Sequence, residues 1–242
     1  MNMKVDLCGV TLNNPVMTAS GTFGSGAEYA EFVDLNKLGA VVTKGVANVP
    51  WPGNPTPRVA EVYGGMLNAV GLQNPGIDLF VERDIPFLKQ FDTKIMVNVC
   101  GHSTEEYIEV VERLRDQPVD LLEINISCPN VKEGGIAFGQ DPKAVEAITK
   151  EMKKHAAQPV IMKLSPNVTD ITEMARAAEA GGADGLSLIN TITGMKIDIN
   201  RQKFVLANKT GGMSGPAIHP VAVRMVYQTA QAVRLPIVGM ES

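Results

Sequence analysis

Cysteine is scarce in this chain, which has three cysteines among its 242 residues and no Cys-x-x-Cys pair. Cys8, Cys100 and Cys128 are odd in number and widely spaced. Disulfide frameworks and zinc sites are built from more closely grouped cysteines, so the sequence argues against both. Unpaired thiols are typical of a reducing compartment, and we therefore expect a cytoplasmic protein.

Long apolar runs and an excess of one charge are also absent. Residues 1–6 contain no apolar stretch of the kind found in a signal peptide, and no later segment is long enough to span a bilayer. The 22 basic and 26 acidic residues give a net charge of -4, whereas phosphate binding needs a concentrated basic surface. We expect neither a membrane nor a nucleic acid as the partner.

Histidine occurs only three times, and its positions indicate no catalytic or metal-binding pattern. His102, His155 and His219 stand singly near or within expected helices. Neither a Ser-His-Asp triad nor a set of metal ligands is recognisable around them. We therefore expect no metal, and the chemistry must come from other side chains.

The sequence does contain short apolar runs that alternate with amphipathic stretches. The runs are residues 15–19, 40–44, 95–99, 121–126, 160–164, 185–189 and 236–239, and the helical stretches are residues 77–89, 103–115, 141–157, 170–180 and 220–233. Strands that are apolar on consecutive positions and alternate with helices indicate a parallel sheet. Because polar and glycine-rich residues gather just after the runs, the pattern favours a barrel over a doubly wound sheet.

We expect an α/β fold of the (β/α)8 TIM-barrel type that forms a single domain over residues 1–242. An N-terminal β-hairpin at residues 4–12 would close the opposite end of the barrel. Such a barrel needs eight strands, and seven apolar runs are present. The expected barrel is therefore incomplete at its C-terminal end, with open strand edges unless another element covers them.

Two lysines stand at the ends of predicted strands. Lys44 ends the second apolar run, and Lys163 lies within the fifth. A buried ammonium group is costly without a polar or anionic partner, so the pair indicates a functional site, although a lysine at a strand end often extends to solvent. A Schiff-base aldolase that uses Lys163 or Lys44 is one alternative function.

Asparagines recur at the same end of the predicted strands, at Asn98, Asn125 and Asn190. An amide suits the edge of a pyrimidine or a flavin, although a single asparagine is more commonly a turn residue. Residues 18–21 lie at the end of the first run, where small side chains let the backbone approach a flat ligand or simply turn. Residues 64–76 are predicted either to fold over a small polar ligand or to form a plain surface loop.

The most specific segment is Asn125-Ile126-Ser127-Cys128-Pro129-Asn130. A thiol just after a strand end can act as a nucleophile or as a general base. Cys8 and Cys100 are interpreted as inert buried cysteines. The glycine-containing residues 131–140 are predicted to form a mobile lid.

This segment resembles the active site of class 1 dihydroorotate dehydrogenases, and further motifs resemble the class 1B branch. The similarity runs in the same order along the chain, from near the N-terminus to Met240. The motifs are Gly53-Asn54-Pro55-Thr56-Pro57-Arg58, residues 66–76, 131–135, 138–142 and 163–170, and Gly211-Gly212-Met213-Ser214-Gly215-Pro216-Ala217. The resemblance implies an enzyme of pyrimidine (UMP) biosynthesis that oxidises dihydroorotate to orotate and reduces bound FMN.

The resemblance also implies roles for individual residues. Cys128 would take the proton from C5 of dihydroorotate while hydride leaves C6, and Lys163 would stabilise negative charge on the reduced flavin. The substrate would be bound by Lys44, Asn68, Ala69, Val70, Gly71, Leu72, Asn125, Asn190 and Thr191. FMN would be bound by Ala19, Ser20, Lys44, Gly45, Asn98, Asn125, Lys163, Ile189 and Gly215.

Class 1B enzymes pair this subunit with a second one that carries FAD and an iron–sulfur cluster and passes electrons to NAD⁺. We expect such a partner, with a homodimer of this chain inside a heterotetramer. In the family, a Gly-Gly turn and a later turn hold the FMN phosphate, and Glu241-Ser242 stand where Gly-Gly is expected. A shortened and catalytically inactive remnant is therefore the second alternative.

Overall fold

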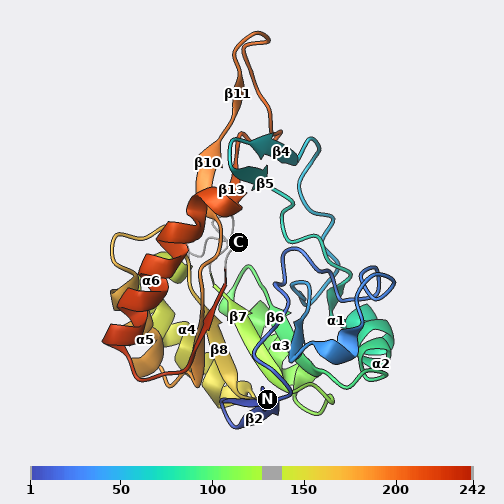
Figure 1. Ribbon diagram of the computed structural model, residues 1–242. Coiled ribbons are helices and arrows are strands. Elements are labelled where there is room, and N and C mark those ends of the chain that lie inside the picture. Colours follow the sequence, from blue (N-terminus) through green and yellow to red (C-terminus); the bar gives the residue numbers. More distant parts are fainter. Residues whose placement is uncertain (1, 127–137, 241–242) are drawn as a thin grey trace.

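The computed structural model describes residues 2–126 and 138–240, and its centre is a parallel β-sheet (Figure 1). The sheet order is β3-β6-β7-β8-β9-β14. All neighbouring strands in it run parallel. The strands are β3 (Ala40–Val42), β6 (Lys94–Val99), β7 (Leu121–Asn125), β8 (Val160–Lys163), β9 (Gly185–Leu188) and β14 (Ile237–Gly239). Six of the seven predicted strands are thus confirmed.

The first apolar run, residues 15–19, was wrongly predicted as a strand. Met17 makes a single parallel bridge to Ala40 beside β3. Thr18 explains why the ladder stops there, because its hydroxyl accepts from the Val42 amide at 2.9 Å and donates to the Val42 carbonyl at 3.2 Å. A side chain has replaced the backbone groups that a strand would supply. The segment still occupies the edge position expected of a first barrel strand.

The main helices confirm the predicted ones. They are α3 (Thr104–Leu114), α4 (Pro142–His155), α5 (Ile171–Ala180) and α6 (His219–Ala232). Ser103, Asp141 and Asp170 each accept a backbone N–H in the first turn of α3, α4 and α5, respectively. Residues 77–89, predicted as one helix, form three consecutive pieces: α1 (Gly76–Leu79), the π-helical η2 (Phe80–Asp84) and α2 (Ile85–Leu88). Three 3₁₀ turns complete the helical segments: η1 (Leu35–Lys37), η3 (Phe138–Gln140) and η4 (Pro216–Ile218).

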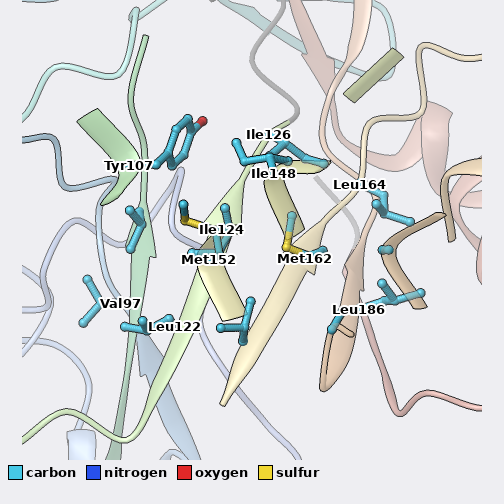
Figure 2. Packing of buried hydrophobic residues seen from close by; sticks show 14 of the residues in the cluster. Val97, Tyr107, Leu122, Ile124, Ile126, Ile148, Met152, Met162, Leu164 and Leu186 are labelled. Carbon is cyan, nitrogen blue, oxygen red and sulfur yellow. The ribbon is translucent and has the colours of Figure 1, made fainter. Parts of the chain in front are cut away.

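The outer face of the sheet carries the main hydrophobic core. Side chains alternate along a strand, so Val97, Leu122 and Met162 point outward, where Ile148 and Met152 of α4 pack against the same cluster (Figure 2). Figure 1 shows α4, α5 and α6 side by side along this face. Helices outside a curled parallel sheet are the arrangement predicted for a (β/α) barrel.

The inner face is apolar only near its lower end. Met96, Leu121 and Ile161 form a small cluster there with Ala40 and Val42. The N-terminal hairpin of β1 (Val5–Leu7) and β2 (Val10–Leu12) covers this cluster by burying Leu7 and Leu12 against it. The predicted hairpin is confirmed, and it leaves the opposite end of the sheet for a functional site.

A second sheet, which the sequence analysis did not predict, stands above the parallel one (Figure 1). Its antiparallel strands are β4 (Val59–Val62), β5 (Gly65–Asn68), β10 (Ile192–Met195) and β13 (Thr210–Ser214), in the order β10-β13-β5-β4. The short strands β11 (Ile197–Asp198) and β12 (Lys203–Phe204) extend from it as a protruding hairpin. The first residues of the predicted 64–76 loop are therefore strand, whereas the rest of that segment connects β5 to α1.

Within the described residues, no strand lies on the free side of β14. A cavity of about 460 Å³ borders this edge and is lined by β14, the N-terminal hairpin and the Met17–Ala19 region. The curled sheet is thus open between its first and last strands, as predicted for an incomplete barrel. None of the helices in the described part of the chain has the length and apolar character needed to cross a membrane.

The hairpin turn gives one pH-dependent prediction. Burial raises the pKa of the Cys8 thiol from 9.0 to about 11, with a further contribution from the Asp184 and Asp6 charges, and the thiol donates to the Asp184 carbonyl at 3.3 Å. The folded state therefore holds this proton more tightly than the unfolded state. We expect the wild type to lose stability relative to Cys8→Ser as the pH rises from 9 to 11, measured by urea unfolding. A constant difference across that window would contradict the prediction.

Candidate active site

Polar side chains occupy the upper part of the inner face, at the carboxyl ends of the strands. In the strand register, Asn98 pairs with Glu123, Asn125 with Lys163, and Lys163 with Ser187. Paired residues on neighbouring parallel strands project to the same face, so these five side chains share one layer. All five are buried. A buried polar layer where barrel enzymes hold their ligands is the candidate site.

Lys163 is the charged centre of this layer. Its side chain lies inside the molecule, with the residue only 5% exposed. Among the described residues its amine makes one hydrogen bond, at 3.3 Å to the hydroxyl of Ser20, and no ion pair with a carboxylate. The structure thus brings Lys163 and Ser20 together although they lie 143 positions apart in the sequence. An ammonium group with a single neutral partner is suited to an anionic ligand.

The three predicted asparagines form a connected row. The amide of Asn98 donates to Glu123 at 2.5 Å and accepts from Asn125 at 3.4 Å. Asn125 in turn accepts from the amide of Asn190 at 3.5 Å, and Asn190 accepts from the backbone N–H of Thr191 at 2.8 Å. The structure therefore brings Asn98, Asn125, Asn190 and Thr191 into one wall of the site.

Gly45 and Leu72 lie beside this wall. A side chain at Gly45 would place its Cβ 3.1 Å from the Asn98 amide oxygen, 3.3 Å from the Cys100 sulfur and 3.5 Å from Leu72. Gly45 therefore lets the backbone pack closely against Asn98, and a larger residue would crowd the Asn98 amide. Leu72, at a φ of 52°, belongs to the predicted substrate loop and lies beside Gly45.

The other residues of the predicted substrate loop lie at different places. Asn68 ends β5 and pairs with Gly212, whose missing side chain leaves room for the Thr191 hydroxyl. The backbone of Ala69 bonds to Arg58 and to the side chain of Asn54, and Gly71, at a φ of 77°, packs closely on Asn54.

Lys44 and Val70 line a separate, open hollow of about 780 Å³ between residues 24–31 and the segment that precedes α1. The backbone N–H of Lys44 donates to the Gly24 carbonyl at 2.8 Å. Lys44 follows β3 by two residues, and its place in this hollow differs from that of Lys163 in the polar layer. The two predicted lysines are therefore near the same end of the sheet but in different surroundings.

Three predicted FMN residues lie at the margins. Ala19 lines the cavity beside β14, and Ile189 follows β9, where its backbone N–H donates to Met240. Gly215 has a φ of 115° and packs against Gly64 and Gly65 at the foot of the second sheet.

Cys128 and residues 131–137 of the predicted lid (residues 131–140) lie outside the described residues. The strand that leads to Cys128 is well anchored, because the Tyr107 hydroxyl donates to the Asn125 carbonyl at 2.7 Å. The segment therefore leaves the sheet from the polar end of β7.

Sequence reasoning missed two members of the layer, Glu123 and Ser187. The hydroxyl of Ser187 donates to Glu123 at 2.7 Å, and the two residues are 1% and 0% exposed. The signal was present in the sequence: Glu123 is a lone carboxylate inside an apolar run, where a charge is as unusual as a lysine.

Comparison with known proteins identifies the class of this barrel. A solved dihydroorotate dehydrogenase from Eimeria tenella, in complex with ferulenol, superposes with a TM-score of 0.76 over 100% of this chain and 73% of that one, at 21% sequence identity. The likeness shows the fold, which is the incomplete form of the barrel predicted from the sequence.

Sequence comparison shows the family to which the chain belongs. The family model described as dihydroorotate dehydrogenase matches residues 2–241, and the chain belongs to this family, as the resemblance indicated. It is 75% identical over 240 residues to the "Dihydroorotate dehydrogenase B (NAD(+)), catalytic subunit" of Lachnoclostridium phytofermentans, covering 99% of this chain and 80% of that protein. The proteins of the same name from Alkaliphilus metalliredigens and Geobacter sulfurreducens are 68% and 56% identical.

Proposed function

We propose that this chain oxidises dihydroorotate to orotate, with FMN as the hydride acceptor, in pyrimidine biosynthesis. The observation that carries the proposal is the 75% identity, over 99% of the chain, to a protein named as the catalytic subunit of dihydroorotate dehydrogenase B. The buried amine of Lys163 beside a wall of asparagine amides supports it, because this is chemistry that a flavin and a pyrimidine would use.

The described residues fit a flavin ring. Lys163 offers a buried cation without a carboxylate partner among the described residues, and Gly45 carries no side chain that would crowd Asn98. Ser20, Asn98 and Lys163 would then hold the ring. When bound, FMN supplies the hydride acceptor that amino-acid side chains cannot provide.

The chain's own residues would act on the substrate in three ways. Asn125 and Asn190 would hold the polar edge of the pyrimidine. Asn68, at the end of β5, would contribute a further amide from the second sheet. Lys163 would stabilise negative charge that develops in the site. Cys128 would take the proton from C5 of the substrate as general base.

The printed names of the relatives also support an electron acceptor and a partner. They name NAD(+) and a catalytic subunit, so we propose that electrons leave this chain for NAD⁺ through a second subunit that carries FAD and an iron–sulfur cluster. A homodimer of this chain within a heterotetramer and a location in the cytoplasm belong to the same proposal.

An anaerobic reduction experiment tests the proposed function. Purified protein is saturated with FMN, separated from free flavin and mixed with dihydroorotate. We expect the absorption of the bound oxidised flavin to bleach and orotate to appear in equal amount. Flavin that stays bound and oxidised in the presence of dihydroorotate would refute the proposal. Covalent trapping of a carbonyl substrate on Lys163 or Lys44 by borohydride would instead favour the aldolase alternative.

A further inference from the structure

The buried carboxylate of Glu123 is the one charged group at the lower end of the amide row. It accepts two hydrogen bonds, from the Asn98 amide at 2.5 Å and from the Ser187 hydroxyl at 2.7 Å. At 1% exposure it is as deeply buried as its apolar neighbours in β7. Burying a carboxylate is costly, and an apolar residue of similar size would commonly stabilise the sheet as well or better. Its retention calls for a role beyond packing.

The direction of the hydrogen bonds indicates that role. A carboxylate only accepts, whereas an asparagine amide can donate from one end and accept at the other and can turn over by 180°. Because Glu123 accepts, Asn98 must direct its NH₂ group toward Glu123 and its oxygen toward Asn125. That oxygen requires an NH₂ group from Asn125, which in turn directs the Asn125 oxygen toward Asn190.

The upper end of the row imposes the same direction. The backbone N–H of Thr191 can only donate, and it bonds to the oxygen of Asn190 at 2.8 Å. Asn190 must therefore direct its NH₂ group toward Asn125. The two ends agree: the pure donor at Thr191 and the pure acceptor at Glu123 require the same orientation of the three amides between them. The links near Glu123 are short, and those between the amides, at 3.4 and 3.5 Å, are long.

We propose that Glu123 is a positioning residue that fixes the orientation of Asn98, Asn125 and Asn190, and thereby the donor and acceptor pattern that the wall presents to a flavin and a pyrimidine. The orientation rests on the described contacts alone, and the ligands rest on the proposed function. Glu123 acts through the asparagines, and its effect should be largest at Asn98 and decrease along the row because the later links are longer.

Glu123→Gln is the variant that tests this role. Glutamine has nearly the same shape, but its amide can accept from Asn98 or donate to it. The row therefore loses the acceptor that fixes its lower end, while the Thr191 N–H still orients Asn190 at the upper end. The side-chain amide signals of ¹⁵N-asparagine-labelled protein, measured by NMR without any flavin, report the orientation directly. We expect the Asn98 signal to double or broaden in Glu123→Gln, the Asn125 signal to change less and the Asn190 signal least.

Two control variants separate orientation from stability. Ser187→Ala removes the other hydrogen bond to Glu123 but leaves the row intact. Thr149→Val removes a buried hydroxyl that donates to Val145 within α4, away from the inner face. Both should lower the free energy of unfolding without doubling the asparagine signals. Unchanged signals in Glu123→Gln, or equal doubling in Ser187→Ala, would overturn the proposal.

Ligand binding gives the second readout. We expect Glu123→Gln to bind FMN roughly tenfold more weakly than the wild type, since an amide hydrogen bond of fixed direction is lost at Asn98. FMN affinity within twofold of the wild type would overturn the functional part of the proposal. If the wild-type protein itself binds FMN but does not oxidise dihydroorotate, the proposed function fails, and the NMR result still decides whether Glu123 orients the amides.

Discussion

Lys163→Met is expected to slow flavin reduction by dihydroorotate roughly 10²-fold while leaving the protein folded and no less stable. The kinetic loss follows from removing a buried cation from the place where the proposed reaction would develop negative charge. The stability follows from the burial of the residue: its amine has one hydrogen bond, to Ser20, and no carboxylate partner among the described residues. Methionine fills a similar space without a buried charge.

Stopped-flow bleaching of the flavin and urea unfolding measure the two effects on the same protein. The matched control is Lys153→Met, which removes a partly buried lysine that pairs with Asp184 at 2.6 Å on the outer side of the sheet. It should lose stability and keep its rate of flavin reduction. If Lys163→Met instead lost stability and reduced its flavin at the wild-type rate, Lys163 would be a structural lysine and the role proposed for it would be wrong.

The parallel sheet was predictable because its strands are buried on both faces. Residues such as those of β7 and β8 are apolar on consecutive positions, and this pattern is rare outside a covered parallel sheet. The helix starts were equally clear, since Ser103, Asp141 and Asp170 are caps that act through local hydrogen bonds alone. A cap bonds to residues two or three positions further along the chain, so the sequence alone is enough to predict it.

The second sheet was not predictable in the same way. β13 contains Gly211 and Gly212, which usually weaken a strand. The need for glycine in β13 becomes visible only in the folded structure. The Asn68 carbonyl occupies the space where a side chain at Gly211 would lie, and Thr191 occupies the space at Gly212. The strand predicted at residues 15–19 was wrong for a related reason. The Thr18 hydroxyl makes the hydrogen bonds to Val42 that backbone groups were expected to make.

The candidate site was predictable as a set of residue types, and its connections were not. The asparagines and Lys163 were recognisable because polar groups at strand ends are costly without a purpose. Their order depends on register: Asn98 meets Glu123, and Lys163 meets both Asn125 and Ser187. Ser20 joins Lys163 from the other end of the chain. Glu123 was passed over because it lies within a strand rather than at its end, and only its two hydrogen bonds indicate its role.

Cys128→Ser is expected to slow dihydroorotate oxidation by about 10²- to 10⁴-fold, which is the usual contribution of a general base. Serine keeps the size of the side chain, but its hydroxyl gives up a proton far less readily than a thiol. The segment leaves β7 at Asn125, whose carbonyl is held by the Tyr107 hydroxyl. Asn125 itself belongs to the asparagine wall.

The pH dependence of flavin reduction distinguishes a base from a structural cysteine. With a thiol as the base, the wild-type rate should rise with pH until the thiolate predominates, and Cys128→Ser should need a much higher pH for the same gain. FMN affinity should stay within about twofold of the wild type, because the role proposed for Cys128 is on the substrate. Cys8→Ser is the matched control: its thiol donates to Asp184 at the opposite end of the sheet, so its rate and pH profile should not change. If Cys128→Ser reduced its flavin at the wild-type rate, another residue would have to be the base.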